Sequence, residues 1–407
     1  MATMVRKACV LLLCTLVAGT GRQGNVRRHA PENEAGRTSD LQTATRSLTA
    51  LTREYPYYHT TEEISAKAKE LAERCGAPAS FRTASENGVS IDVIRVQSSS
   101  KKPRNKVLIL FGEHSRELIG PESGLGLLEA LCSDKPSEQV KAALQDSEFE
   151  LILNGNPRSR RKVEAGDYCI RTNPSGVDLN RNWDEEWQKE SVAHGSDSNP
   201  GPSPFSEPET RLFRSIASDF APQTFLTVHS GTLGLYMPWA YDMEHLASRN
   251  QRKMMGVLKG LDEKHCRCPF GAAGKEVGYS CPGTSLDWIY DKLNTSYSFA
   301  FEIFVGADLM RSLRARWQEH SQDAEALLQA GDHLAHPNTK HFFQAHPSDF
   351  VQLRQRKLKQ TASQCFEQYN PSNEELYKST VGNWVSAYLE MAVKIADNIR
   401  AEEGRQG

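Results

Sequence analysis

Beyond its N-terminal region, this 407-residue sequence has no apolar run near the about 20 residues that a membrane-spanning helix needs. Neither sign of charge dominates, because 49 Lys and Arg residues are balanced by 51 Asp and Glu residues. The basic surface of a nucleic-acid-binding protein is therefore not expected. The Gly-x-Ser-x-Gly motif of many serine hydrolases is also missing. With 38% hydrophobic and 25% charged residues, the composition still favours a folded core over disorder.

One short apolar run does occur, at the N-terminus. Arg6 and Lys7 precede the apolar residues 8–18, which end at the small residues Ala18 and Gly19. This pattern is typical of a secretory signal peptide, so we predict a signal over 1–21, a linker or short pro-segment over 22–47, and a secreted or lumenal protein. An organellar transit sequence is the alternative, because Arg, Ser and Thr continue to about residue 47; acidic residues in this stretch argue against it.

The sequence has nine cysteines, and two of them fall inside the predicted signal. Seven remain, and an odd number in an exported protein predicts at least one unpaired or intermolecular thiol and up to three disulfides. The connectivity cannot be deduced from the spacing. The Cys266-x-Cys268 pair does not have the spacing of a zinc site.

The hydrophobic pattern alternates between strand-like and helix-like stretches. A capped helix is predicted after Thr60, and further helices at 121–131 and 376–399; strands are predicted at 90–96, 107–111, 149–153, 224–228 and 297–304. Strands separated by helices indicate an α/β fold, a three-layer α/β/α domain with a mixed, mostly parallel sheet over 48–402. Residues 311–364 are charged and rich in Gln and His, which we interpret as an insertion or lid.

Two histidines follow predicted strands, where reactive residues of α/β sheets collect. His114-x-x-Glu117 offers two zinc ligands from one turn, and His229 offers a third, which would leave a fourth position for water. Taken singly, each feature has a simpler interpretation. A His-x-x-Glu pair is more often a solvated turn, and a lone histidine after an apolar run is usually a hydrogen-bonded core residue.

Further motifs connect these residues to a family. Residues 171–182 read RTNPSGVDLNRN, and the segment 279–302 contains YSCPGTSLDW followed by FAFE. Together with 114–117 and His229, these segments resemble the zinc metallocarboxypeptidases of the carboxypeptidase A type, over about residues 48–304. The simpler interpretations do not predict such an ordered set of matches.

The resemblance implies one zinc ion per chain, bound by His114, Glu117 and His229. It also implies that Asp178 accepts a hydrogen bond from the outer nitrogen of His114, which fixes the ring. Glu302 would act as the general base on the attacking water and then pass the proton to the leaving amine. The alternation of large and small residues in 297–302 independently places this glutamate on the small-residue face of its strand.

Several arginines compete for the remaining roles. The resemblance assigns Arg171 to the oxyanion that forms when the carbonyl is attacked. Arg160 and Arg161 are the competing candidates, but the fixed spacing of Arg171 before the DLNRN segment favours Arg171. Arg116, inside the ligand motif, resembles a residue that contacts the substrate backbone.

The remaining positions concern the end of the substrate. Asn180 and Arg181 would bind its terminal carboxylate, for which the planar guanidinium is well suited, and Tyr279 would close over it. In the family that the chain resembles, an acidic residue at the position of Leu286 favours Lys and Arg as the departing C-terminal residue. This chain has a leucine there, and residues 236–240, which should line the same pocket, contain no acid either. We therefore expect an apolar pocket that prefers aliphatic or aromatic C-terminal residues.

The sequence thus predicts a zinc-dependent carboxypeptidase acting on the C-terminal ends of peptides and proteins. Two alternatives use the same fold: a zinc amidase or acyl-amino-acid hydrolase, and a secreted binding protein without activity. Gly231 stands where pancreatic members have an aromatic residue, so the subsite beyond the scissile bond is expected to be more open. The oligomeric state is not indicated by the sequence.

Overall fold

The computed structural model describes residues 48–100, 102–189, 196–307 and 360–406. All of them belong to one compact unit, Ser47–Gly407, and a second unit, Met1–Arg46, lies outside the described residues. The signal peptide and the linker therefore stay predictions, as does the domain boundary at residue 402. Most of the insertion predicted over 311–364 also lies outside the described residues.

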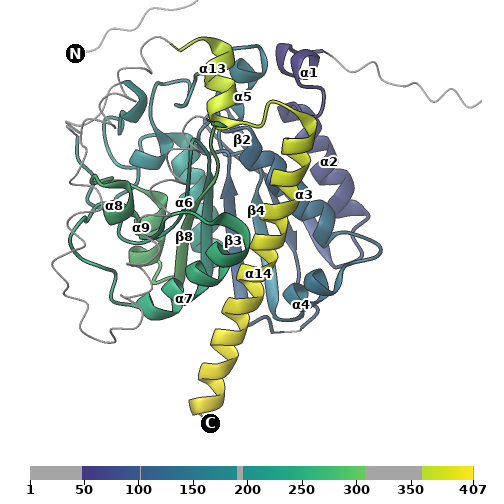
Figure 1. Ribbon diagram of the computed structural model, residues 1–407, viewed down its shortest axis with the longest axis vertical. Helices are drawn as coiled ribbons and strands as arrows, with labels where there is room; N and C mark the ends of the chain where they lie inside the picture. The colour runs from purple at the N-terminus through teal and green to yellow at the C-terminus, as the bar shows by residue number, and fades with distance from the viewer. Residues whose placement is uncertain (1–47, 101, 190–195, 308–359, 407) are drawn as a thin grey trace, which may run out of the picture. The chain divides into compact units, whose positions relative to one another are not determined.

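The described strands form one mixed sheet with the order β1-β2-β4-β3-β5-β8-β6-β7 (Figure 1). The pairs β4/β3, β3/β5, β5/β8 and β6/β7 are parallel, and the other three neighbouring pairs are antiparallel. The predicted mixed, mostly parallel sheet is thus confirmed. The strands are β1 Ala79–Glu86, β2 Val89–Val96, β3 Asn105–Phe111, β4 Ser147–Ile152, β5 Thr224–His229, β6 Thr232–Met237, β7 Phe270–Ala272 and β8 Tyr297–Phe304.

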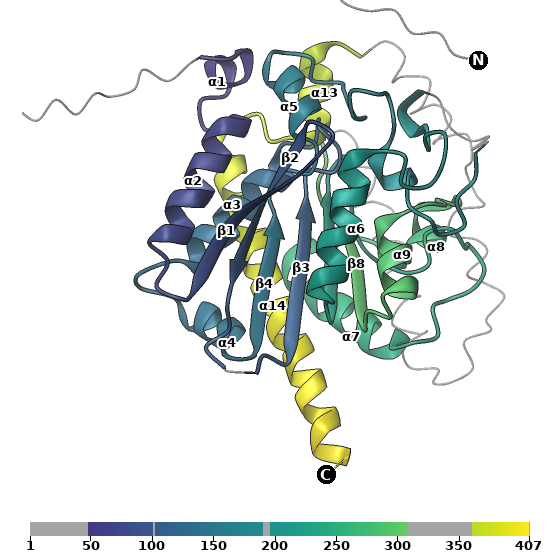
Figure 2. The same ribbon diagram turned by 180° about the vertical axis from the view of Figure 1, so that it is seen from behind.

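Helices cover both faces of the sheet, which confirms the three-layer fold. On the face toward the viewer in Figure 1 lie α2 Thr61–Glu73, α3 Ile119–Leu131, α4 Glu138–Asp146, α7 Gln251–Leu261 and the long α14 Glu374–Gln406. On the opposite face, seen in Figure 2, lie α6 Pro208–Phe220 and α9 Ser285–Lys292. The shorter helices are α1 Ala50–Glu54, α5 Pro157–Glu164, α8 Ala273–Val277, α13 Ala362–Tyr369, η1 Leu179–Arg181, η2 Ser196–Ser198 and the π-helix η3 Asp262–Cys266.

Local sequence signals explain the elements that matter for the site. Thr60 and Glu63 form the predicted capping box at the start of α2. The apolar residues of β3 are at most 1% exposed, as expected for a strand buried on both faces. Helix α14 is longer than the predicted 376–399, but its apolar face docks on the sheet as predicted, with Tyr388 and Ile395 fully buried.

Three disulfides connect six of the seven cysteines outside the predicted signal. Cys75–Cys132 joins the C-terminal ends of α2 and α3, and Cys169–Cys365 joins the loop before Arg171 to α13. The third disulfide, Cys266–Cys268, closes a very short loop, and Cys281 keeps a buried thiol.

Among the described residues, no helix is both long and apolar enough to cross a membrane.

Candidate active site

The sheet topology brings three predicted site residues to one edge. Strands β3, β5 and β8 are parallel neighbours, so their carboxyl ends lie side by side, and His229 pairs directly with Glu302. The chain leaves β3 through Gly112, whose φ of +71° favours glycine and where a Cβ would lie 2.9 Å from Pro121 Cγ. This turn carries His114 to the same edge.

His114, Glu117 and His229 converge there as a candidate metal centre. Their candidate ligand atoms all lie within 4.8 Å of one another, and the three residues are 3%, 2% and 3% exposed. His114 Nδ1 lies 2.8 Å from Glu117 Oε1, and His229 Nδ1 lies 3.1 Å from both His114 Nδ1 and Glu117 Oε2. Two imidazole nitrogens and one carboxylate facing a common point fit the donor set of a catalytic zinc site.

Asp178 supports this centre from behind, as the sequence predicted. Its Oδ1 accepts a hydrogen bond from His114 Nε2 at 3.0 Å and another from the Asn180 backbone N–H, at the start of η1. Burial alone would raise the pKa of Asp178, but the charges of Arg171 and His114 hold the pKa well below its ordinary value. The carboxylate therefore stays ionised and fixes His114 in one orientation.

Of the three competing arginines, the structure brings only Arg171 to the centre. Its Nη1 lies 3.6 Å from Glu117 Oε1, and its Nη2 lies 2.9 Å from Asp178 Oδ2. Arg160 is 1% exposed and donates to Glu164 and Glu122 in the interior. Arg161 is exposed and pairs with Glu62.

Asn180 and Arg181 lie on the short η1 helix beside the metal centre. Ser285 donates its backbone N–H to Asn180 Oδ1 at 3.0 Å, and Asn180 Nδ2 lies 3.4 Å from His229 Nε2. Arg181 is buried and donates to the Asn180 backbone oxygen at 2.6 Å. Tyr279 follows α8 and is 41% exposed; the neighbouring Cys281 thiol and burial raise the pKa of its phenol, so its hydroxyl is a neutral donor.

Leu286 is buried in a small apolar cluster next to the strand that carries Glu302. The buried members of this cluster are Tyr236, Ala240, Ala273, Cys281 and Leu286, and the partly buried ones are Val277 and Ala300.

Sequence reasoning missed an acid beside this cluster, Glu276. Its Oε1 lies 2.7 Å from the position that a Cβ on Gly271 would take. Gly271 pairs with Tyr236, which pairs in turn with Ala300, so all three share one face of the sheet. The structure records no hydrogen bond or ion pair for this described residue, and burial raises its pKa to about 7. A Gly-rich stretch before Tyr279 is the only sequence signal for it.

One expectation is wrong: the space beside Gly231 is filled. Gly231 has φ +120°, and a Cβ there would lie 2.4 Å from the ring of Tyr369. Tyr369 ends α13, and its ring stacks under the Arg116 guanidinium at 4.3 Å. Arg116 also donates to Asp197 Oδ2 at 2.9 Å and to the Cys169 backbone oxygen at 3.1 Å. An aromatic ring from a distant segment therefore occupies the space that the glycine leaves.

Glu113 is the second acid that sequence reasoning missed. It is fully buried directly before His114, and its Oε2 lies 3.6 Å from His229 Nε2. Trp183 donates to its Oε1 at 3.3 Å, and Thr227 donates to its Oε2 at 3.2 Å. Burial raises the pKa of Glu113 to about 7, while the charge of His229 acts in the opposite direction. The sequence did contain a signal for Glu113, because it is a charged residue that closely follows the buried strand β3.

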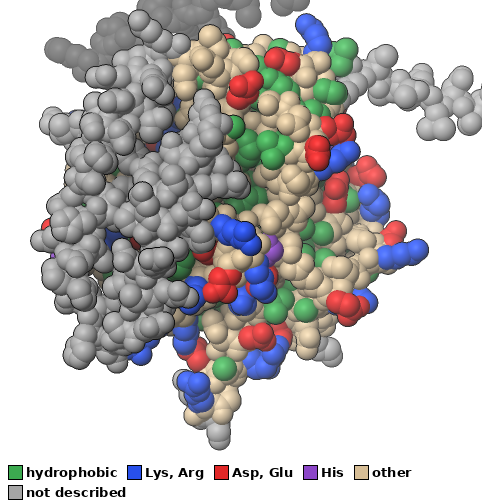
Figure 3. Space-filling model, in the orientation of Figure 1, with side chains coloured by type: hydrophobic (Ala, Val, Ile, Leu, Met, Phe, Trp, Pro, Cys, Tyr) green, Lys and Arg blue, Asp and Glu red, His purple; other side chains and the backbone are tan. Residues whose placement is uncertain are grey.

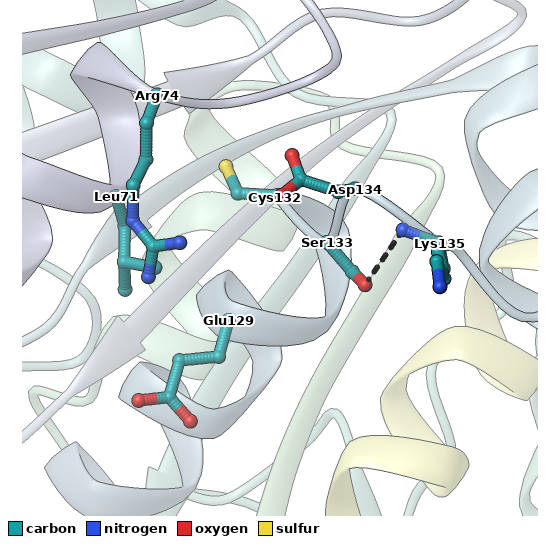
Figure 4. Close-up of a pocket in the computed structure, with 7 residues that line it drawn as sticks. All are labelled: Leu71, Arg74, Glu129, Cys132, Ser133, Asp134 and Lys135. Atoms are coloured by element: carbon teal, nitrogen blue, oxygen red, sulfur yellow. Dashed lines mark hydrogen bonds between the residues drawn. The ribbon is translucent and has the colours of Figure 1, made fainter.

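A pocket beside the Cys75–Cys132 disulfide lies at the C-terminal ends of α2 and α3 (Figure 4), whereas the metal centre precedes the N-terminus of the 13-residue α3. A helix of that length spans about 20 Å. Figure 3 shows acidic and basic side chains interspersed on the described part of the visible face. The pocket is lined by Leu71, Arg74, Glu129, Cys132, Ser133, Asp134 and Lys135.

Comparison with known proteins identifies the family. The family profile described as zinc carboxypeptidase matches residues 64–314, which is more than half of the chain. The chain therefore belongs to the zinc carboxypeptidase family.

Solved structures agree on the fold. Bovine thrombin-activatable fibrinolysis inhibitor, in complex with tick carboxypeptidase inhibitor, gives a TM-score of 0.59 at 19% identity and covers 84% of this chain and 98% of that chain. Carboxypeptidase A from Helicoverpa armigera gives a TM-score of 0.53 at 19% identity and covers 72% of this chain and 78% of that chain.

Curated relatives are distant. Carboxypeptidase A2 of Mus musculus is 28% identical over 271 residues, covering 60% of this chain and 62% of the relative. Carboxypeptidase A5 of Homo sapiens is 27% identical over 282 residues, covering 61% and 60%. The chain thus spans about three fifths of the length of these relatives. A protein of Paracoccidioides lutzii named inactive metallocarboxypeptidase ECM14 is 25% identical over 247 residues, covering 51% and 41%.

Proposed function

We propose that this chain is an active zinc-dependent carboxypeptidase that removes residues one at a time from the C-terminal ends of peptides and proteins. The observation that carries the proposal is the pairing of His229 with Glu302 at the edge where His114 and Glu117 complete a zinc donor set. Zinc, held by these three ligands, would supply Lewis-acid polarisation of the scissile carbonyl and activation of the attacking water.

The chain's own residues have separate roles in proton transfer, charge stabilisation and substrate binding. Glu302 takes the proton of the attacking water and delivers it to the leaving amine. Arg171 carries the only guanidinium in the described residues within 4 Å of the Glu117 carboxylate, so it stabilises the negative charge on the attacked carbonyl oxygen. Arg116, stacked on Tyr369, contacts the backbone of the substrate on the other side of the scissile bond.

The free carboxylate of the substrate is bound by a separate group of residues. Arg181 presents a planar cation and Asn180 an amide at the helix η1, and Tyr279 closes over them. A positive charge next to the metal centre therefore favours substrates that end in a carboxylate.

The departing side chain would contact the cluster around Leu286. Because its members are apolar, we propose a preference for aliphatic or aromatic C-terminal residues. Glu276, on the same face of the sheet, adds one acid at the border of this cluster. The preference for apolar side chains is therefore expected to depend on the charge state of Glu276.

Peptides with free and with amidated C-termini test the activity. The protein, incubated with a library containing both and analysed by mass spectrometry, is expected to shorten only the free-acid peptides, one residue at a time. A zinc chelator should abolish the reaction. Cleavage of acyl-amino acids or amides with intact peptides would favour the amidase alternative. Stoichiometric zinc without any turnover would favour an inactive protein, as one relative is named.

The pH dependence of specificity tests the role of Glu276. Above pH about 7 its carboxylate is charged, and below that pH it is neutral. The ratio of kcat/KM for peptides ending in Arg to that for peptides ending in Phe should therefore rise by about tenfold from pH 6 to pH 8, since hydrogen bonds to charged groups are the stronger ones. In Glu276→Gln the ratio should stay flat. Equal pH profiles in both proteins would exclude contact between Glu276 and the substrate.

We further propose a secretory route. It is supported by the N-terminal apolar run and by the three disulfides, which persist in oxidising compartments.

A further inference from the structure

Glu113 and Thr227 lie behind His229, on the side away from the other two proposed metal ligands. We propose that they form a hydrogen-bond chain, His229 Nε2–H to Thr227 Oγ1 and Thr227 O–H to Glu113 Oε2, that positions His229 as a ligand. This inference rests on the proposed zinc site. It gives His229 a buried carboxylate partner of its own, reached through a hydroxyl group.

The proton positions follow from the metal-facing nitrogen. His229 Nδ1 points at His114 Nδ1 and Glu117 Oε2, both at 3.1 Å, so Nδ1 must offer its lone pair to a cation. A neutral imidazole that uses Nδ1 as a ligand carries its proton on Nε2. His229 Nε2 is therefore a donor and needs an acceptor.

Thr227 is the acceptor that the strand geometry supplies. Residues 227 and 229 lie two apart on β5 and share one face, and Thr227 Oγ1 is 2.9 Å from His229 Nε2. The other close group, the Asn180 amide nitrogen at 3.4 Å, is itself a donor and cannot accept this proton. Once Thr227 Oγ1 accepts from His229, its own hydrogen points to Glu113 Oε2 at 3.2 Å.

The chemistry of Glu113 favours this role over a purely structural one. The side chain is 0% exposed, and no Lys or Arg pairs with it among the described residues. Burying a carboxylate without a cation is costly, so a structural acceptor for Trp183 and Ser285 would be served better by a neutral amide. A carboxylate makes sense behind an imidazole bound to a cation, as Asp178 already does for His114 at 3.0 Å.

Zinc affinity of the full chain separates the two interpretations. In competition with a chromophoric chelator, Thr227→Val is expected to bind zinc about 10- to 100-fold more weakly than the wild type, the usual effect of losing such a partner. Thr227→Ser keeps the hydroxyl and should retain the affinity. Glu113→Gln should also weaken zinc binding. The double variant, Thr227→Val with Glu113→Gln, should bind zinc as tightly as the single variant with the lower affinity, because both changes break the same hydrogen-bond chain.

Thr224 offers a matched control on the same strand. It is also fully buried, and its hydroxyl donates to Asn105 Oδ1 at 2.7 Å, at the end of β5 away from the metal centre. Thr224→Val should lower the melting temperature without changing zinc affinity. If Thr227→Val behaves like Thr224→Val, the inference is wrong, and Glu113 is a structural acceptor. Should Thr227→Val not fold, wild-type affinity in Glu113→Gln would be equally decisive. A folded wild type that takes up no zinc would overturn the proposed metal site itself.

Discussion

Glu302→Gln is expected to lower kcat by about 10²- to 10⁴-fold, the range that positioned general acid–base groups contribute. The amide keeps the size of the side chain but can neither take the proton of the attacking water nor return one to the leaving amine. Because Glu302 is not one of the three proposed ligands, zinc content should stay at one ion per chain. The measurement is kcat on a free-acid peptide ending in Phe, together with metal analysis of the same sample.

Glu150→Gln is the control for this prediction. Glu150 lies on strand β4 of the same sheet, is 3% exposed and pairs with Arg82, away from the metal centre. It tests whether the loss of a buried glutamate from the sheet by itself impairs the enzyme. Glu150→Gln should keep nearly full kcat. A Glu302→Gln protein that retains more than about a tenth of wild-type kcat would refute the general-base assignment.

The elements that carry the metal centre could be predicted from the sequence because their signals are local. The apolar run 107–111 is typical of a strand that is buried on both faces, and β3 contains it. The alternation of large and small residues in 297–302 is typical of a strand with two different faces, and β8 contains it. His114 and His229 were recognised because each lies where a strand ends. Parallel pairing of β3, β5 and β8 then brings those ends together without any further information.

Side chains that meet across strands or from distant loops could not be predicted in this way. Glu276 reaches the Leu286 cluster because a glycine in β7 leaves room for its carboxylate. Tyr369 fills the space at Gly231 although 138 positions separate them in the sequence, and the Cys169–Cys365 disulfide ties its helix to the site. Such contacts depend on which strands pair and where a distant helix docks, and no short motif encodes that.

For the three candidate arginines, the sequence indicated a preference, and the structure was needed to decide among them. Sequence spacing favoured Arg171, but Arg160 and Arg161 remained candidates because all three lie between the same two strands, β4 and β5. The structure separates them by their partners: Arg160 is enclosed by Glu122 and Glu164, and Arg161 is exposed on α5.

Arg171→Gln is therefore expected to lower kcat by about 10²- to 10³-fold, the usual cost of removing one group that stabilises the oxyanion. The amide has no positive charge to offset the negative charge that develops on the attacked oxygen. Because Asp178 also loses a partner at 2.9 Å, zinc affinity must be measured in parallel. Arg171→Lys keeps the charge but loses the planar donors, so its kcat should fall between those of Arg171→Gln and the wild type.

Arg161→Gln is the matched control, since it removes the same group from the same stretch of chain but loses only an exposed pair with Glu62 and a 3.4 Å hydrogen bond to the Pro157 backbone oxygen. Its kcat should equal that of the wild type. If Arg171→Gln lost zinc in proportion to its activity, Arg171 would act by holding Asp178 and, through it, His114. A fall in kcat at full zinc occupancy, with zinc affinity unchanged, is the result that assigns Arg171 to the transition state, because only a group that interacts more strongly there than with bound substrate changes kcat.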